Sequence, residues 1–163
     1  EACQDYLTGL LNRRGLEAAA DALDGKDMPL AVYLFDLDNL KHINDTFGHM
    51  RGDQTISAFA ELLREQTRES DILSRFGGDE FVVIMKQMKS GESAVKKGED
   101  ICRSICEYPF ADNVRACCSA GVVIWDTRKP LPAILEYADQ ALYRAKAENK
   151  GGCCMWEDGY EYP

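Results

Sequence analysis

The chain has 163 residues, of which 45% are hydrophobic and 29% are charged, and its formal net charge is −9 at pH 7. This length predicts a single domain with a core of its own. The negative charge argues against a broad basic surface for a nucleic-acid polymer, although a divalent cation can still join an acidic protein to one nucleotide. No apolar run approaches the roughly 18 residues of a membrane-spanning helix, so we expect no membrane contact.

The pattern of the seven cysteines fits neither a zinc site nor a disulfide framework. Their number is odd, and none are spaced as C-x-x-C, so small core residues are the better interpretation. Free thiols favour a reducing compartment, and we expect a cytoplasmic location, either alone or as the cytoplasmic part of a membrane-anchored sensor. The sequence has no initiator Met and no signal-peptide pattern, so we expect a piece of a longer protein.

Hydrophobic periodicity and turn residues predict alternating helices and strands. Continuous apolar runs indicate strands that are buried on both faces, and a repeat near 3.6 indicates amphipathic helices. The expected elements, in chain order, are a helix over 12–23 capped by Asn12, a strand over 30–35, a short helix ending near Gly48, a helix over 52–68, hairpin strands over 72–76 and 81–86, a helix over 92–108, a strand over 114–125, a helix over 131–149 and an edge strand over 153–157.

The centre of this order is β-α-β-β-α-β, the ferredoxin-like arrangement. We therefore predict one α+β domain over residues 1–163, with a mostly antiparallel central sheet flanked by helices, and we expect these helices to pack on one side of it. In such a sheet the first strand can lie beside the hairpin. Asp36, where the first strand ends, is then expected close to Asp79 and Glu80 at the hairpin turn.

That turn carries the most informative stretch, Phe76-Gly77-Gly78-Asp79-Glu80-Phe81. Two glycines predict a tight turn, because glycine adopts positive φ without steric cost and lets a bulky group approach the backbone. Taken alone, the stretch also fits an exposed acidic turn. With Asp36 alongside, three carboxylates oppose folding unless a cation lies between them, and hard oxygen ligands suit Mg²⁺ or Mn²⁺. For Asp38, helix capping is the simpler interpretation.

The turn resembles the signature of the GGDEF family, the diguanylate cyclases, and further segments match this family in the same order. The resemblance implies a palm-type domain that condenses two GTP into cyclic di-GMP and two pyrophosphates across a transient dimer, by metal-assisted attack of a 3′-hydroxyl on an α-phosphate. It also implies a sensory or regulatory region on the N-terminal side. The matching segments are 5–14 (DYLTGLLNRR), 36–45 (DLDNLKHIND), 46–49 (TFGH) with Gly52-Asp53, 119–121 (SAG) and 138–146 (ADQALYRAK).

The same resemblance implies the residues that would hold the metal. Asp36, Asp79 and the Leu37 carbonyl would be ligands, and Glu80 would assist a second metal or the 3′-hydroxyl. A metal pair can hold the attacking and leaving oxygens of such a displacement. Which carboxylate acts as the base stays open. The Gly77-Gly78 pair would let phosphates or the partner's nucleotide lie against the turn.

Phosphate contacts are implied for the backbone around Asn39 and Leu40, where a helix begins, and for Lys41, which also has a catalytic role in this assignment. Lys146 and Lys150 match two further basic positions. The family commonly has Arg at the second position, so Lys150 keeps the charge and loses the bidentate fork. For either lysine, a solvated helix end is the alternative.

The family pattern places Asn44 and Asp53 at the Watson–Crick edge of guanine. A carboxylate can accept both N1–H and N2–H₂ of guanine, whereas adenine would leave a buried Asp53 without a partner. The alternatives are a carboxylate favoured by the helix dipole for Asp53 and a structural helix-end residue for Asn44.

Arg68 and Asp71 form an R-x-x-D motif that ends six residues before Gly77, as in the product-inhibition site of the family. Arg68 would grip a guanine or a phosphate of cyclic di-GMP, and Asp71 would accept from a guanine edge. The alternative is a salt bridge between residues i and i+3 at a helix end.

Two other functions compete with an active cyclase. One is a silent module that binds GTP or cyclic di-GMP and signals through a partner, and the other is a different nucleotide cyclase or polymerase-like palm. The acidic signature argues against the first, because silent family members usually lack it. Asn44 and Asp53 argue against another base.

Overall fold

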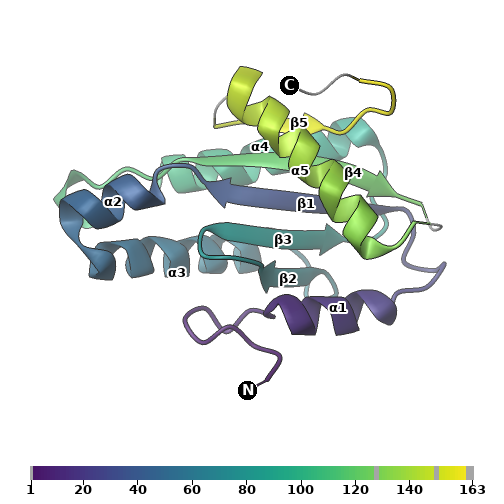
Figure 1. The fold of residues 1–163 in the computed structure, drawn as a ribbon, viewed down its shortest axis with the longest axis horizontal. Coiled ribbons are helices and arrows are strands. Elements are labelled where there is room, and N and C mark those ends of the chain that lie inside the picture. The colour runs from purple at the N-terminus through teal and green to yellow at the C-terminus, as the bar shows by residue number, and fades with distance from the viewer. Residues whose placement is uncertain (1, 127–128, 149–150, 161–163) are drawn as a thin grey trace.

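The computed structural model describes residues 2–126, 129–148 and 151–160. They form a five-stranded sheet with helices packed against it (Figure 1). No helix in these ranges is both long enough and apolar enough to cross a bilayer. The elements are α1 (Arg13–Asp21), β1 (Leu30–Leu37), α2 (Leu40–Phe47), α3 (His49–Gln66), β2 (Ile72–Arg75), β3 (Glu80–Met85), α4 (Gly91–Cys106), a 3₁₀ turn (Ala111–Asn113), β4 (Cys118–Trp125), α5 (Leu131–Glu148) and β5 (Cys153–Met155).

The sheet has the strand order β2-β3-β1-β4-β5, with β1 at its centre. β1 is antiparallel to both β3 and β4, and β2 is antiparallel to β3. Among the described strands, β5 alone runs parallel to its neighbour, β4. The predicted α+β class and the mostly antiparallel ferredoxin-like sheet are therefore confirmed.

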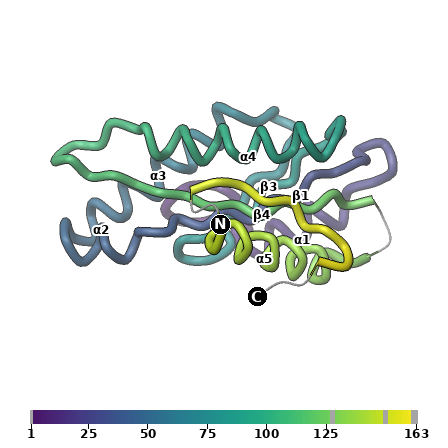
Figure 2. The backbone as a smooth tube through the Cα atoms, turned by 90° about the horizontal axis from the view of Figure 1, so that it is seen from above, coloured from purple at the N-terminus to yellow at the C-terminus, as the bar shows by residue number. Residues whose placement is uncertain are grey.

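The expectation that the helices pack on one side is wrong. Figure 2 shows α3 and α4 on one side of the sheet and α1 and α5 on the other. Tyr33 and Phe35 belong to one buried cluster, and Val32 and Leu34 belong to the other. Successive side chains of a strand point to opposite faces, so the unbroken apolar run of β1 creates two apolar surfaces, and each must be covered.

The hairpin turn has four residues, as the expected strands imply, but it begins one residue earlier in the chain. β2 ends at Arg75 and β3 begins at Glu80, and the N–H groups of Phe76 and Gly77 donate to the Glu80 carbonyl over 2.8 and 3.2 Å. Neither Gly77 nor Gly78 has a φ between +20° and +160°, so the predicted need for positive φ is wrong. A four-residue loop spreads the bend over more residues. A Cβ on Gly78 would meet nothing within 4 Å, so the space for an approaching group is present.

α5 lies directly against β4 at Gly121. A Cβ at this position would collide with the Ala138 carbonyl oxygen and the Leu142 amide nitrogen, both of which are backbone atoms of α5. Gly121 is also the register partner of Leu34 on β1. The absence of a side chain here holds α5 close to the sheet and brings its C-terminal half toward the end of β1.

Gly121→Ala should lower the free energy of unfolding by about 1–3 kcal/mol, because neither colliding atom can move without shifting α5. Urea denaturation measures this as a lower midpoint at an unchanged slope. Gly25→Ala is the matched control, since a Cβ there meets nothing within 4 Å. Equal stability of the two variants would contradict the close approach of α5.

Candidate active site

Three carboxylates meet where β1 ends and β3 begins. Asp36 is the register partner of Glu80 on β3 and of Ser119 on β4. Asp79 directly precedes β3, and its carbonyl accepts a hydrogen bond from the Leu37 N–H over 3.0 Å. Asp36 is buried, with 8% of its surface exposed. The structure therefore brings together the three acidic residues that the sequence predicts to meet.

Crowding of these carboxylates changes their acidity. Burial raises the pKa of Asp79, and the neighbouring charge of Asp36 raises it further. Burial also raises the pKa of Glu80, followed by the charges of Asp36, Asp79 and Asp139. Both groups are thus harder to ionise than exposed carboxyls, as expected when several negative charges share a partly dehydrated site.

Lys146 supplies positive charge to this cluster from the last turn of α5. Its ammonium group donates to Oδ2 of Asp36 and lies 3.7 Å from Oδ1 of Asp38. Burial acts to lower the pKa of Lys146, but the hydrogen bond with Asp36 and the charges of Asp36, Asp38 and Asp79 outweigh it, and the pKa is raised. Lys146, which the family resemblance predicts to contact phosphate, contacts two carboxylates in this structure.

The capping interpretation of Asp38 is wrong. α2 follows Asn39, and no side chain caps its first turn. Asp38 instead accepts a hydrogen bond from the Ser119 hydroxyl over 2.7 Å, and only 2% of its side chain is exposed. Its carboxylate points toward β4 and Lys146, which the sequence spacing could not indicate.

The donor set fits a hard divalent cation. Oδ1 of Asp36 is buried and, within the described part of the chain, has no hydrogen-bond partner. No three or more His, Cys, Asp or Glu side chains in residues 2–126, 129–148 and 151–160 form a ready-made metal cage. Mg²⁺ commonly binds one or two protein carboxylates and takes its other ligands from water and phosphate, so a complete cage is not required.

The start of α2 presents backbone rather than side chains. The Asn39 side chain is hydrogen-bonded to the loop before β4: its amide donates to the Arg115 carbonyl over 2.6 Å and accepts from the Cys117 N–H over 2.9 Å. The Leu40 side chain is buried, which leaves its N–H at an uncapped helix N-terminus. Lys41 is 90% exposed and pairs with Asp45 over 2.9 Å, away from the carboxylate cluster.

The two predicted guanine contacts lie on either side of Gly52. Asn44 packs over this glycine so closely that a Cβ would collide with its amide oxygen, and that oxygen is buried with no hydrogen-bond partner among the described residues. Asp53 follows Gly52 but is exposed, so the expectation of a buried Asp53 is wrong. It borders a hollow of about 630 Å³ that Tyr108 also lines.

Arg68 and Asp71 form the predicted alternative, a local ion pair. Asp71 accepts from the N–H groups of Arg68 and Lys86 over 2.9 and 3.0 Å, and only 3% of its side chain is exposed. Arg68 lies 3.7 Å from Asp71, is 57% exposed and donates to the Lys86 carbonyl. Both residues line a hollow of about 570 Å³ together with Lys89 and Lys97.

Residue-by-residue reasoning missed two members of the cluster, Ser119 and Asp139. Both lie in segments that match the family, but nothing in their local pattern indicates a role. β4 brings Ser119 opposite Asp36, and α5 brings the charge of Asp139 near Glu80. Lys150 lies outside the described residues.

Lys146→Met should destabilise the protein by about 1–3 kcal/mol at pH 7, because Asp36 and Asp38 would lose their shared cation. Mg²⁺ should restore part of this loss. Lys41→Met removes an exposed lysine and should leave stability nearly unchanged. Thermal unfolding of both variants, with and without Mg²⁺, measures the difference, and equal behaviour would refute the role of Lys146.

Glu80→Gln should stabilise the protein at neutral pH by up to about 1 kcal/mol after allowance for solvent screening. The folded state holds the Glu80 proton more tightly than the unfolded chain does. Stability from this group is therefore lost as pH rises from the ordinary value of 4.5 through the raised folded pKa. The gain should vanish below about pH 4, where Glu80 is protonated in both states. Urea denaturation over this pH range would show a constant difference if the carboxylate were not crowded.

Comparison with known proteins identifies relatives of the chain. The family profile described as "Diguanylate cyclase, GGDEF domain" matches residues 2–152. Diguanylate cyclase DgcP of Pseudomonas aeruginosa is 40% identical over 155 residues, which cover 90% of this chain and 23% of that protein. Diguanylate cyclase DgcZ of Escherichia coli is 32% identical over 159 residues, which cover 94% and 53%. The chain thus spans only part of the length of these curated relatives.

Solved structures agree with this match. The GGDEF domain of TpbB (YfiN) from Pseudomonas aeruginosa is 34% identical, with a TM-score of 0.82 and 94% of each chain covered. The active GGEEF domain of a Vibrio cholerae diguanylate cyclase is 31% identical, with a TM-score of 0.82 over 92% of this chain and 99% of that one. The carboxylate cluster, the sheet order and these likenesses agree, and the chain belongs to the GGDEF family of diguanylate cyclase domains.

Proposed function

We propose that this domain condenses two molecules of GTP into cyclic di-GMP and two pyrophosphates. The observation that carries the proposal is the meeting of Asp36, Asp79 and Glu80 at one end of the sheet, with raised pKa values for Asp79 and Glu80. The names of the relatives, which are diguanylate cyclases, support it. In each of two steps, a 3′-hydroxyl oxygen bonds to an α-phosphorus, the α–β bridging P–O bond breaks, and pyrophosphate leaves.

In this proposal Asp36, Asp79 and the Leu37 carbonyl hold Mg²⁺ or Mn²⁺, and Glu80 assists. When bound, the ion neutralises triphosphate charge and activates the attacking oxygen. The uncapped N–H groups at the start of α2 bind phosphate oxygens, because a helix N-terminus carries partial positive charge. Lys146 already lies beside Asp36 and exchanges this contact for the triphosphate. Lys41 and Lys150 add further positive charge.

Two carboxylates suit the role of base. A general base must lie within reach of the proton that it removes, and Asp79 and Glu80 both lie where β3 begins. Glu80 lies on β3 opposite Asp36, so a hydroxyl held at this strand end can lose its proton to Glu80. The open space beside Gly78 leaves room for the nucleotide that carries the hydroxyl.

Guanine is selected by Asn44 and Asp53, which flank Gly52 at the start of α3. The Asn44 amide oxygen is buried and lacks a hydrogen-bond partner in the described residues, so it can accept from the base. Asp53 is exposed and can turn toward the base, where a carboxylate accepts two guanine N–H groups. Since each domain binds one GTP, reaction requires a second copy that presents its own GTP, and the dimer is transient.

Incubation of the chain with GTP and Mg²⁺ should yield cyclic di-GMP, measured by chromatography of the nucleotides. Glu80→Gln should lower the rate by at least about 100-fold, because it removes a base or a metal contact, while the fold is retained. Artificial dimerisation controls for weak self-association. If a dimerised sample binds GTP and makes no product, the domain is a silent nucleotide-binding module. The ion pair of Lys146 with Asp36, a proposed metal ligand, is the observation that favours this second candidate function.

We also propose that cyclic di-GMP inhibits the enzyme through the hollow beside Arg68. The exposed guanidinium of Arg68 lies near Lys89 and Lys97, which makes this hollow attractive to phosphate. Asp71 already accepts two backbone N–H groups, so it positions the loop and Arg68 supplies the main ligand contact.

Arg68→Ala should raise the cyclic di-GMP concentration for half inhibition by at least about tenfold, because a charge-assisted contact is lost. Initial rates measured against added product provide the test. Arg103→Ala, on the exposed surface of α4, is the matched control. An unchanged inhibition curve for Arg68→Ala would mean that this pair is only a local ion pair.

A further inference from the structure

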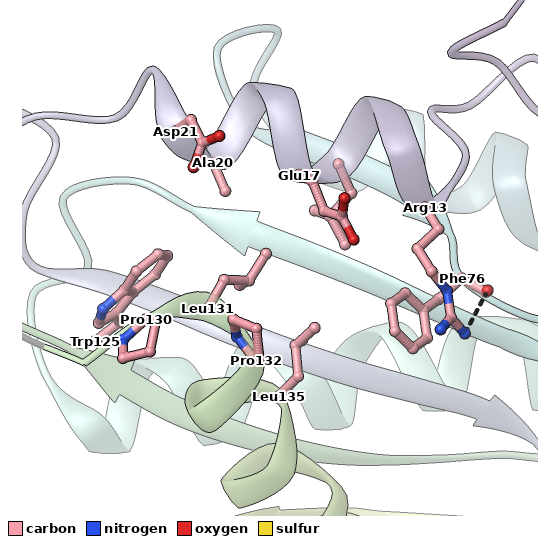
Figure 3. Close-up of a pocket in the computed structure, with 11 residues that line it drawn as sticks. Arg13, Glu17, Ala20, Asp21, Phe76, Trp125, Pro130, Leu131, Pro132 and Leu135 are labelled. Carbon is pink, nitrogen blue, oxygen red and sulfur yellow. Dashed lines mark hydrogen bonds between the residues drawn. The ribbon is translucent and has the colours of Figure 1, made fainter.

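A groove separates α1 from α5 on the face of the sheet opposite α3 and α4. Its volume is about 710 Å³, within the range of pockets that bind small organic molecules. Figure 3 shows α1 along one side and the start of α5 along the other, with strands of the sheet behind them. The groove is distinct from the carboxylate cluster, because none of Asp36, Asp79 and Glu80 lines it.

The walls of the groove are largely apolar. Leu16 and Ala20 on α1 face Leu131 and Leu135 on α5. Phe76 and Trp125 lie at opposite ends (Figure 3), so an aromatic ring on either side bounds the space. Aromatic and aliphatic walls of this kind favour a ligand with a flat, apolar body.

The charge on the α1 side of the groove is negative on balance, with the two carboxylates of Glu17 and Asp21 against the one guanidinium of Arg13. Glu17 and Asp21 are one helical turn apart and point toward the groove (Figure 3). Neither side-chain carboxylate has a hydrogen bond or an ion pair with any residue that the structure describes. Arg13 also lines the groove, where its guanidinium stacks on the Phe76 ring at 3.9 Å and donates to the Phe76 carbonyl over 3.5 Å. Its single positive charge offsets only one of the two carboxylates.

We propose that this groove binds a small organic cation with an aromatic body. The apolar walls take the ring, and the carboxylates of Glu17 and Asp21 attract the cationic group. The same carboxylates repel anionic ligands, GTP and cyclic di-GMP among them. Phe76 lines the groove and directly precedes Gly77, so the ligand would contact the segment that carries the catalytic turn.

Tryptamine and indole-3-propionate are the probes, because they share a ring and differ in the sign of their charge. Tryptamine should bind at least about ten times more tightly, and Glu17→Gln with Asp21→Asn should weaken its binding by about three- to tenfold. Glu136→Gln, an exposed acid on α5 outside the groove, should change nothing. In NMR titrations the indole N–H of Trp125 should shift, and that of Trp156, which stacks on Tyr137, should not.

Ala20→Leu should block tryptamine by filling the groove, whereas Ala18→Leu, on the exposed side of α1, should bind it normally. Both the charge and the bulk variants are measured without nucleotide, so the outcome does not depend on cyclase activity. Equal affinity for the two probes, or binding that survives Ala20→Leu in a folded protein, would overturn the proposal.

Discussion

Repulsion among carboxylates at one end of the sheet is the constraint on which the site depends. Asp36, Asp79 and Glu80 are drawn together by the pairing of β1 with β3, and burial makes their charges costly. Lys146 offsets part of that cost through its ion pair with Asp36. In the proposed function a divalent cation supplies the positive charge that the cluster lacks, and the triphosphate supplies further oxygen ligands to that cation.

The sheet and α5 together create this arrangement. Asp36 continues the row of Val32 and Leu34, so its side chain points to the face that α5 covers. Gly121 lets the α5 backbone lie against β4, which places Lys146 over the end of β1. The same face carries the α1–α5 groove, which is lined by Phe76, the residue directly before Gly77 and Gly78. The packing of α5 on this face therefore places Lys146 beside the carboxylate cluster.

The sequence was sufficient for the order of the elements and for the meeting of the carboxylates, because a long apolar run and a hairpin leave few ways to pair the strands. Some bounds were wrong: the strand expected over 114–125 begins only at Cys118, and the strand expected over 153–157 ends at Met155. It did not reveal that helices cover both faces, although the run in β1 implies two apolar surfaces. The predictions that Asp38 caps a helix and that Asp53 is buried were wrong. Both properties depend on residues distant in the chain, such as Ser119, which donates to Asp38. The roles of the site residues remain predictions.

The central claim is that the carboxylates of two paired strands hold a divalent cation together with a triphosphate. Paramagnetic broadening by Mn²⁺, in the presence of a non-hydrolysable GTP analogue, tests it most directly. The amide signals of Leu37, Asp79 and Glu80 should broaden first, and Asp36→Asn should largely abolish the effect, because Asp36 faces Glu80 across the strands. Broadening that survives Asp36→Asn, or that centres on Arg68 and Asp71, would contradict the account.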